Sequence, residues 1–340
     1  MAFAVDTRRL GAGGLAFAIT ALLAWFGTGL EPWWPLMWFA PIPVLIFALR
    51  ASWWGAGLVA GSAWGAGTFN LWNYAHGVLG LPASVLLRIV VGQALLFTLA
   101  VLLFRALSKR GANAAATLAF PALWVSCEYV IEANSIHGTG GNLAYTQLGF
   151  LPFLQIASLT GPWGMSFLLL LFSSAVATGV QLYRAAPKQA LRIAGASVGV
   201  IIAVLVFGVV RLALPAPGQP VKVGLVAYDG VEDGMAEAGA PTAKLFRGYA
   251  DHVTKLAAEG ARVVVLPEKL GVAIDPQTQD TDALFQSLAN ETRADIVVGM
   301  VRVASNAKYN EARIYVPDAP VATYDKQHML PPFESKLKPG

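Results

Sequence analysis

Two charged residues in the last quarter of the chain have the types and surroundings that acid–base chemistry requires. Glu268 directly follows the apolar stretch VVVLP, and Lys326 directly follows VATYD. A side chain at the end of a buried strand leaves the core while its backbone keeps a rigid support. There a glutamate is suited to act as a general base and a lysine to stabilise a developing oxyanion. On spacing alone, the alternative of an ordinary surface Glu and surface Lys is the stronger one.

The elements that must position these residues form an α/β pattern after residue 220. Val-rich apolar runs predict strands, and two amphipathic stretches between them predict helices. Several strands lack polar alternation, as expected where both faces of a sheet are covered. The resulting order, β-α-β-α-β-β-β, predicts a layered α/β domain. The strands are expected at 221–229, 261–267, 295–303, 310–316 and 321–326, and the helices at 241–260 and 281–292.

The residues before this region have a different composition. The chain has 340 residues, of which 56% are hydrophobic and 13% charged, whereas soluble domains average about 25% charged residues. Four of the 20 acidic residues lie before Pro215 and the other 16 after it. This division predicts a membrane domain at 1–214, a linker at 215–220 and a domain in water at 221–340.

The membrane domain is predicted to be a polytopic bundle of about seven helices, because a spanning helix needs about 20 mainly apolar residues. The net charge of +4 comes from scattered bases, which excludes a nucleic-acid surface. The single cysteine, Cys127, excludes an internal disulfide and a four-cysteine zinc site. We expect no cofactor and no metal. The predicted spans are 10–30, 33–50, 53–72, 83–104, 113–131, 161–183 and 193–213.

The placement of Lys and Arg predicts the orientation of these spans. The segments 73–82 and 132–160 contain no Lys or Arg, and segments rich in these residues stay in the cytoplasm. The N-terminus is therefore expected inside and residues 221–340 outside. The bases on the expected cytoplasmic side are Arg8, Arg9, Arg50, Arg105, Lys109, Arg110, Arg184, Lys188 and Arg192.

Two ionisable residues lie within the predicted spans. Arg88 and Glu128 fall at similar depth near the outer ends of the fourth and fifth spans. Charged groups in a membrane are costly and often pair with one another. Two interpretations stay open: an intramembrane pair of Arg88 with Glu128, and two side chains that each extend to the outer interface.

Longer motifs in both halves resemble a known family. VVVLPEKL, followed by YDKQHMLPPFE, resembles the carbon–nitrogen hydrolase (nitrilase) superfamily, and YNEARIYVPDAPVATYDK is similar to its strand pair before the Lys. Together with seven spans, the segments GSAWGAGTFNLWNYAHG, FPALWVSCEYV and YTQLGFLPFLQIASLTGPWGMSFLLLL resemble the apolipoprotein N-acyltransferase family. This resemblance implies a membrane bundle followed by a nitrilase-like (αββα) domain, of which residues 221–340 make the N-terminal half.

The resemblance also implies an activity. It assigns Glu268 as general base, Lys326 as oxyanion stabiliser and Glu334 as a second acid beside them. A Cys thiolate takes an acyl chain from a phospholipid as a thioester, and the N-terminal amine of a diacylglyceryl-cysteine lipoprotein then accepts it, which is covalent catalysis in two steps. The implied location is the bacterial inner membrane, with the nitrilase-like domain on the periplasmic side.

One departure from the family concerns the nucleophile. The family's catalytic Cys follows a later strand, whereas this chain has 14 residues after Lys326 and no Cys among them. Cys127 lies in a predicted span, where a thiolate is disfavoured. We therefore expect a fragment of a longer protein, inactive as given, with a degenerate homologue as the alternative. Other functions left open are a membrane-tethered amidase or nitrilase and a non-enzymatic membrane protein.

The orientation can be tested by labelling cysteines from the outer side of the membrane. In a Cys127→Ser background, we expect Ala240→Cys to be labelled in intact cells and Arg110→Cys to be protected, because the bias of Lys and Arg places residue 110 inside. Labelling at 110 but not at 240 would invert the topology.

Overall fold

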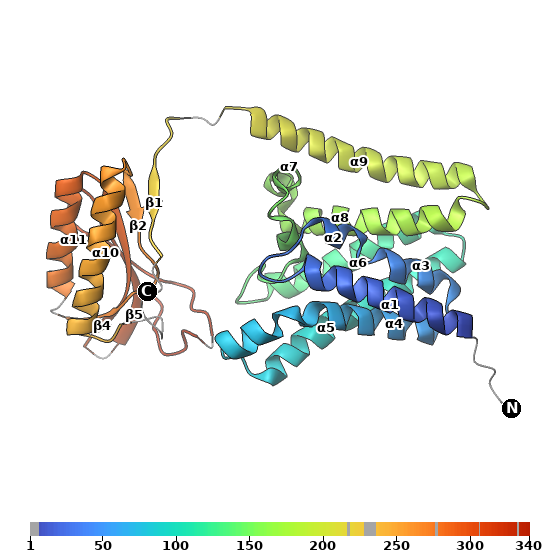
Figure 1. Ribbon diagram of the computed structural model, residues 1–340, viewed down its shortest axis with the longest axis horizontal. Coiled ribbons are helices and arrows are strands. Elements are labelled where there is room, and N and C mark those ends of the chain that lie inside the picture. Colours follow the sequence, from blue (N-terminus) through green and yellow to red (C-terminus); the bar gives the residue numbers. More distant parts are fainter. Residues whose placement is uncertain (1–6, 216–217, 228–235, 276–277, 306, 332) are drawn as a thin grey trace. The chain divides into compact units, whose positions relative to one another are not determined.

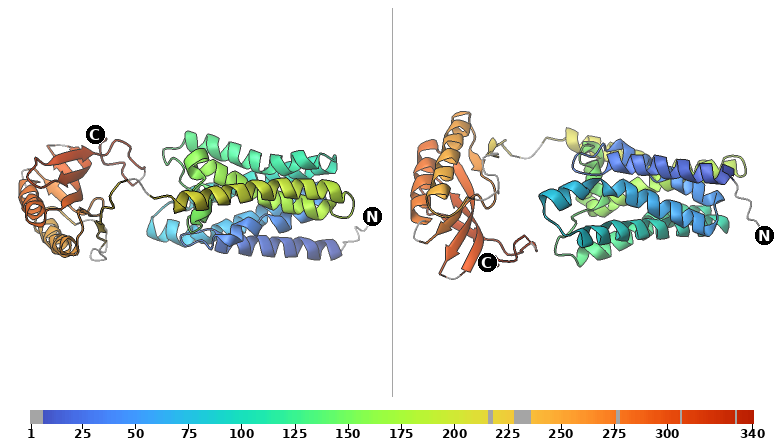
Figure 2. Two further views of the ribbon diagram at one scale, coloured as in Figure 1. Left: turned by 90° about the horizontal axis from the view of Figure 1, so that it is seen from above. Right: turned by 60° about the horizontal axis from the view of Figure 1, so that its bottom comes forward.

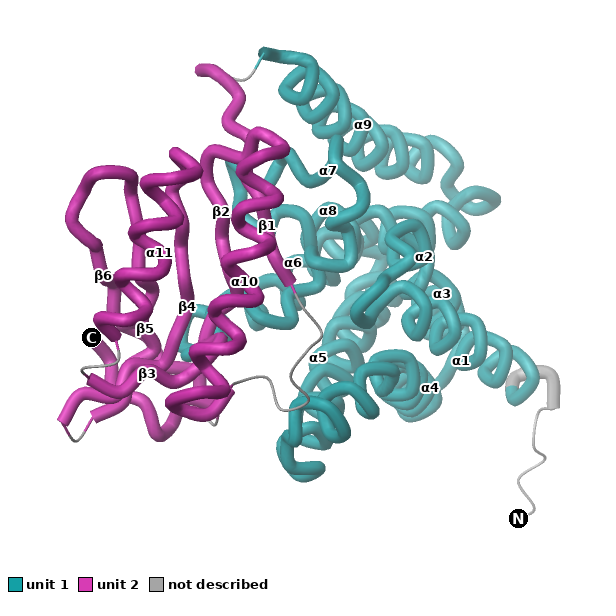
Figure 3. The backbone as a smooth tube through the Cα atoms, turned by 60° about the vertical axis from the view of Figure 1, so that its left-hand side comes forward, with its two compact units in different colours: residues 1–215 teal, residues 216–340 magenta. Residues whose placement is uncertain are grey.

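The computed structural model describes residues 7–215, 218–227, 236–275, 278–305, 307–331 and 333–340, with side chains from residue 10 onward. The chain divides into two compact units, Met1–Pro215 and Ala216–Gly340, which Figure 3 colours separately. The first is helical and the second is built on a sheet. Parts of the predicted linker (216–217) and of the predicted first strand (228–229) lie outside the described residues.

Every predicted span coincides with helical structure in the first unit, whose long helices run side by side in both views of Figure 2. A π-helical turn, Asn73–Val78, and a 3-10 turn, Leu143–Gln147, lie between long helices. The helices are α1 Thr7–Gly27, α2 Pro35–Phe39, α3 Ile42–Arg50, α4 Trp53–Thr68, α5 Ala83–Lys109, α6 Asn113–Ala133, α7 Leu151–Leu154, α8 Ala157–Leu182 and α9 Pro187–Ala213.

Five of the described helices, namely α1, α5, α6, α8 and α9, are long and apolar enough to cross a membrane. The other two predicted spans are shorter helices. The second is divided at Ala40 and Pro41 into α2 and α3, and the third, α4, has 16 residues. Within α8, Gly161 has a φ of 63° directly before Pro162, so the regular spanning part starts there. The protein is membrane-embedded, as these helices require.

Close helix packing in the first unit depends on glycine residues at the helix contacts. Gly208 in α9 lies directly against the backbone of Pro152 in α7, so that a Cβ at 208 would fall inside the contact distance of the Pro152 carbonyl. Gly67 in α4 lies in the same way against Ala21 and Ala24 of α1. Small residues let helix backbones approach, which is the main source of packing energy in a membrane.

The second unit is a mixed sheet with strand order β1-β2-β4-β5-β6, in which β3 pairs with β4 beyond the end of β2. Figure 1 shows both helices of this unit over one face of the sheet. Strands β1 to β4 are parallel, and β4–β5 and β5–β6 are antiparallel. The elements are β1 Val223–Leu225, α10 Ala240–Ala258, β2 Val263–Val265, β3 Val272–Ile274, α11 Thr278–Thr292, β4 Asp295–Ala304, β5 Ala307–Tyr315 and β6 Ala322–Asp325.

The core of the second unit lies between the sheet and its two helices. Phe246 and Val253 of α10 and Phe285 of α11 are buried against Ile296 and Val298 of β4. Even-numbered β4 residues therefore face the helices, since side chains alternate along a strand. The predicted fold class is confirmed, with one element missed: the three-residue strand β3, where the sequence pattern predicts neither a strand nor a helix.

Arg88 and Glu128, for which two interpretations stay open in the sequence, form no ion pair with each other in the described residues. Arg88 is exposed on α5, and its Nε donates to the Ser84 carbonyl of the same helix. Glu128 is buried on α6 and accepts from Trp124 Nε1 at 3.3 Å and from the Leu143 amide at 2.9 Å. The two residues lie at a similar depth along their helices, but Arg88 points to the exposed side of α5 and Glu128 points toward Leu143.

The packing of α9 generates a stability prediction. Gly208→Ala should lower the thermal unfolding midpoint of the purified protein in detergent, because the added methyl must push α9 away from the rigid Pro152 backbone. Gly199→Ala, in the same helix with no atom near its Cβ position, should leave the midpoint unchanged or raise it slightly. Equal midpoints for the two variants would show that α9 does not pack on α7 in this way.

Candidate active site

The candidate active site begins at an interruption between β2 and β3. Both strands pair with the same edge of β4, and the residues from Leu266 to Gly271 separate them. The backbone amides of Leu266 and Leu270 still donate to β4 carbonyls, at 2.9 and 3.1 Å, so a hydrogen bond to β4 holds each end of the interruption. Glu268 and Lys269 lie between these two hydrogen bonds.

Gly299 of β4 makes room for the interruption. A Cβ at this position would lie 2.5 Å from the Pro267 carbonyl oxygen and 2.7 Å from the Cα of Glu268. A glycine in a strand interior often marks such a close approach of another backbone. The backbone of Glu268 therefore rests directly on β4, which fixes the point from which its side chain starts.

Two neighbouring strands supply the partners of Glu268. Asn310 on β5 donates from Nδ2 to Glu268 Oε1 at 2.5 Å, and Lys326, directly after β6, donates from Nζ to the same oxygen at 3.0 Å. The Lys326 amide also donates to the Asn310 carbonyl at 2.8 Å, which continues the strand pairing. The segment after β2, strand β5 and the residue after β6 thus bring the side chains of Glu268, Asn310 and Lys326 into contact.

Glu334 is the buried centre of the group, with a side chain only 2% exposed. Lys326 Nζ lies 2.9 Å from its Oε2, and Asn310 Nδ2 donates to its Oε1 at 2.7 Å. Lys269 Nζ lies 3.2 Å from Oε1, and the Leu330 amide donates to Oε2 at 2.9 Å. Because buried charges must be paired and hydrogen-bonded, this carboxylate fixes the positions of all four donors.

The charges of the group follow from these contacts. Burial alone would raise the pKa of Glu334, but the hydrogen bonds from Lys326, Leu330, Lys269 and Asn310 lower it to about 2. Burial likewise opposes the shift at Glu268, whose pKa is held below its ordinary value by Asn310 and Lys326. The pKa of Lys326 is raised against burial by Glu334 and Glu268. At neutral pH the group contains two carboxylates and a charged Lys326.

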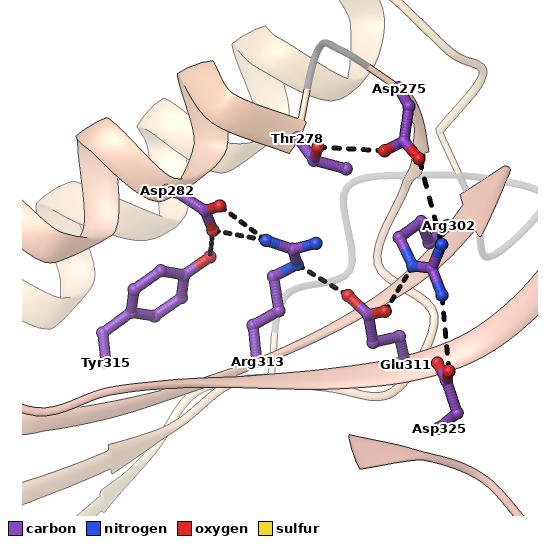
Figure 4. A network of polar contacts seen from close by, with 8 residues as sticks. All are labelled: Asp275, Thr278, Asp282, Arg302, Glu311, Arg313, Tyr315 and Asp325. Carbon is purple, nitrogen blue, oxygen red and sulfur yellow. Dashed lines mark hydrogen bonds and ion pairs between the residues drawn. The ribbon is translucent and has the colours of Figure 1, made fainter. Parts of the chain in front are cut away.

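A second polar network lies on the opposite face of the same strands (Figure 4). Glu311, which follows Asn310, bonds to Arg302 and, at 2.6 Å, to Arg313. Asp325, which precedes Lys326, lies 3.3 Å from Arg302. Arg313 in turn bonds to Asp282 of α11 at 2.6 Å. Since side chains alternate along a strand, this network braces the backbone that carries Asn310 and Lys326.

The first unit contains an apolar cavity of about 600 Å³. Its volume is in the range of small-molecule and lipid pockets, roughly 300–1,000 Å³. The segment from Gly141 to Gly149 forms part of its wall, together with the residues that follow α1, the C-terminal part of α4, the N-terminal half of α5 and Trp124 in the middle of α6. Large apolar side chains that line it include Leu30, Trp64, Phe69, Trp72, Leu86 and Trp124.

Comparison with known proteins bears on the first unit most directly. Residues 13–175 match the family described as the apolipoprotein N-acyltransferase N-terminal domain. Residues 13–175 of this chain are therefore similar to the N-terminal domain of that family. The family resemblance drawn from the sequence motifs is thereby confirmed.

Two curated members of the family extend the match. The apolipoprotein N-acyltransferase of Geobacter metallireducens is 31% identical over 206 residues, which cover 56% of this chain and 38% of the relative. That of Bradyrhizobium diazoefficiens is 27% identical over 278 residues, which cover 76% of this chain and 49% of the relative. The chain thus spans about half or less of the length of these N-acyltransferases.

The structure brings together the three residues that the resemblance singled out, Glu268, Lys326 and Glu334. Sequence reasoning missed the roles of Asn310 and Lys269, which contact the same carboxylates. A signal for Asn310 was its place in the strand paired with the one before Lys326. Cys127 lies in α6 of the first unit. Among the described residues, no His, Cys, Asp and Glu side chains group in a way that would hold a metal ion.

The role of Gly299 can be tested by adding one methyl group. Gly299→Ala should destabilise the second unit by about 1–3 kcal/mol, since its Cβ would meet backbone atoms that cannot rotate away. Gly248→Ala on the exposed side of α10, with no atom near its Cβ position, is the matched control and should be neutral or stabilising. Thermal unfolding followed by near-UV circular dichroism distinguishes the two variants. Equal stability would show that the backbone of Glu268 does not lie against Gly299 as described.

Proposed function

We propose that the second unit carries the acyl-transfer site of an apolipoprotein N-acyltransferase. Glu268 acts as general base, Lys326 stabilises the oxyanion, and Glu334 is the buried acid that holds Lys326. The observation that carries this proposal is the shared ammonium: Lys326 Nζ lies 3.0 Å from Glu268 and 2.9 Å from Glu334. A proton acceptor and a cation side by side are the two groups that acyl transfer through a tetrahedral intermediate needs.

The proposed reaction has two steps. A thiol gives its proton to Glu268 as its sulfur attacks the sn-1 ester carbonyl of a phospholipid, and Lys326 stabilises the resulting oxyanion. The ester C–O bond then breaks, the lysophospholipid leaves with the proton, and a thioester stays on the sulfur. In the second step the free amine of a diacylglyceryl-cysteine lipoprotein attacks the thioester carbonyl, loses its proton and releases the thiol.

The ionisation of the two residues supports these roles. The lowered pKa of Glu268 keeps it deprotonated at neutral pH, so it is able to accept a proton. The raised pKa of Lys326 keeps it charged, so it acts as a cation and not as a base. The side chain of Glu268 is 55% exposed, which leaves it accessible to a reacting group.

The proposal does not use Cys127 as the nucleophile. Its thiol lies in the middle of an apolar helix, where the thiolate form is disfavoured. It is the single cysteine of the 340 residues. The thiol of the proposed reaction is therefore not one that these 340 residues supply, and we expect the 340-residue chain by itself not to form an acyl-enzyme.

Both proposed substrates are lipids, and the first unit is suited to them. Its cavity of about 600 Å³ is lined mainly by apolar side chains and offers room for an acyl chain of the phospholipid donor or of the diacylglyceryl lipoprotein acceptor. The proposed setting is the bacterial inner membrane, with the N-terminus in the cytoplasm and the second unit on the periplasmic side. The bias of Lys and Arg supports that orientation.

The decisive test compares acyl transfer by variants of the complete gene product. With radiolabelled phospholipid as donor and a diacylglyceryl lipopeptide as acceptor, Glu268→Gln should reduce the rate about 10²- to 10⁴-fold, since it removes the general base. Lys326→Ala should reduce it about 10²- to 10³-fold, as loss of an oxyanion-hole donor does. The matched controls Glu291→Gln and Lys308→Ala change exposed residues of the same unit and should be silent.

Two results would contradict the proposal. Full activity of the 340-residue chain would show that another residue is the nucleophile. A complete protein that is inactive on lipid but hydrolyses small amides, with the same dependence on Glu268 and Lys326, would make it a membrane-tethered amidase.

A further inference from the structure

Lys269 is a second lysine of the candidate active site and has no role in the proposed reaction. It follows Glu268 directly and has a φ of 53°, a backbone conformation that L residues other than Gly and Asn rarely adopt. Strained backbone of this kind is often found at functional sites. Here it turns the chain at the interruption between β2 and β3, so that the Lys269 ammonium reaches Glu334 Oε1 at 3.2 Å.

Lys326 and Lys269 differ in the carboxylates to which they bond. Lys326 donates to both Glu268 and Glu334, whereas Lys269 donates to Glu334. Glu334 is the more buried acid by far, with 2% of its side chain exposed against 55% for Glu268. A buried carboxylate that loses its cation is strongly unfavourable. Glu334 therefore holds Lys326 in place unless another cation can compensate its charge.

We propose that Lys269 is a positioning residue that compensates the charge of Glu334, so that the Lys326 ammonium is free to turn from Glu334 toward the reacting oxygen. This inference rests on the proposed role of Lys326 in the reaction. With Lys269 in place, movement of Lys326 leaves Glu334 bonded to an ammonium, to Asn310 Nδ2 and to the Leu330 amide. Without it, the same movement leaves a buried carboxylate with neutral donors.

The proposal has a consequence for Lys326 that does not depend on catalysis. Removing the Lys269 ammonium removes a positive charge near Lys326 and leaves Lys326 as the cation bonded to Glu334. Both changes favour the protonated form of the Lys326 amine. The charged groups that face Lys326 within this group are Glu268, Glu334 and Lys269. The pKa of Lys326, already raised by the two carboxylates, should therefore rise further in a variant that lacks Lys269.

The test measures the reactivity of Lys326 in the 340-residue chain in detergent micelles. Trace acetylation with acetic anhydride, read for each lysine by peptide mass spectrometry across the alkaline pH range, reports the fraction of neutral amine. In Lys269→Met we expect Lys326 to react about three- to tenfold more slowly below its pKa, which corresponds to a rise of about 0.5–1 pKa unit. Lys269→Arg, which keeps the charge, should restore the wild-type rate.

Two further variants separate charge from backbone effects. Lys269→Gly removes the charge and fits the positive φ without strain, so it should slow Lys326 as much as Lys269→Met does. Lys308→Met removes an exposed lysine on β5 and should leave Lys326 unchanged. The near-UV circular dichroism spectrum of each variant, compared with that of the wild type, serves as the check that the unit is folded.

The outcomes decide the proposal independently of the acyl-transfer assay. If Lys326 reacts at the wild-type rate in both Lys269→Met and Lys269→Gly, or if Lys269→Arg fails to restore the rate, the charge-compensating role is overturned. If the shift is present but the complete protein transfers no acyl group, the role of Lys269 toward Lys326 stands and the proposed function fails. In an active complete protein, Lys269→Met should lower kcat more than it raises KM, since the substrate-binding contacts are unchanged.

Discussion

One buried carboxylate governs the arrangement of the second unit's polar site. Glu334 is nearly inaccessible to water and is ionised at neutral pH, so both of its carboxylate oxygens must accept hydrogen bonds from protein donors. Those donors come from the interruption after β2, from β5, from the residue after β6 and from the turn at Leu330. Each of these segments can hold its donor in place only if the sheet is in its observed register. The site and the sheet are therefore stabilised together.

The alternation of side chains along β5 and β6 keeps this site apart from a second ionic network. Asn310 and Lys326 point to one face, and their neighbours Glu311 and Asp325 point to the face that α11 covers. Glu311 is 2% exposed and is bonded to two arginines, so neither strand can slip by a residue without unpairing buried charges. The network thus fixes the register that places Asn310 beside Lys326. In the mechanism that we propose for Lys269, this rigid back face keeps the backbone of the site in place while Lys326 turns.

The sequence predicted the residues whose positions depend on local pattern and missed those that depend on register. Glu268 and Lys326 stand out because each follows a Val-rich strand. Lys269 does not, because its contact with Glu334 arises from a positive φ and from the space above Gly299, neither of which has a signal in a single sequence. Strand β3 was missed because three residues between loops show no period.

The absence of an ion pair between Arg88 and Glu128 has a related cause. Depth along a helix can be read from residue number, and it placed Arg88 and Glu128 at one level. The side of the helix that faces a neighbour depends on how α5 and α6 pack, which residue number does not give. Arg88 faces outward, whereas Glu128 faces the segment that follows α6. Hydropathy patterns therefore located the helices but not the partners of their polar groups.

The two units surround their buried acidic side chains with different kinds of donor, and the difference fits the membrane. In the first unit Glu128 accepts from Trp124 and the Leu143 amide, and Glu132 accepts from Asn142 and Trp163, all neutral donors. Neutral N–H groups need no counter-ion that would itself have to be buried in lipid. They also hold the segment from Asn142 onward against α6, where it forms part of the cavity wall. At the candidate active site of the second unit, Lys326 and Lys269 supply ammonium groups to the carboxylates instead. An ammonium on a flexible stem can leave one partner for another during a reaction. Fixed neutral donors therefore suit a wall that must keep its shape, and a lysine suits the change of partner that we propose for Lys326.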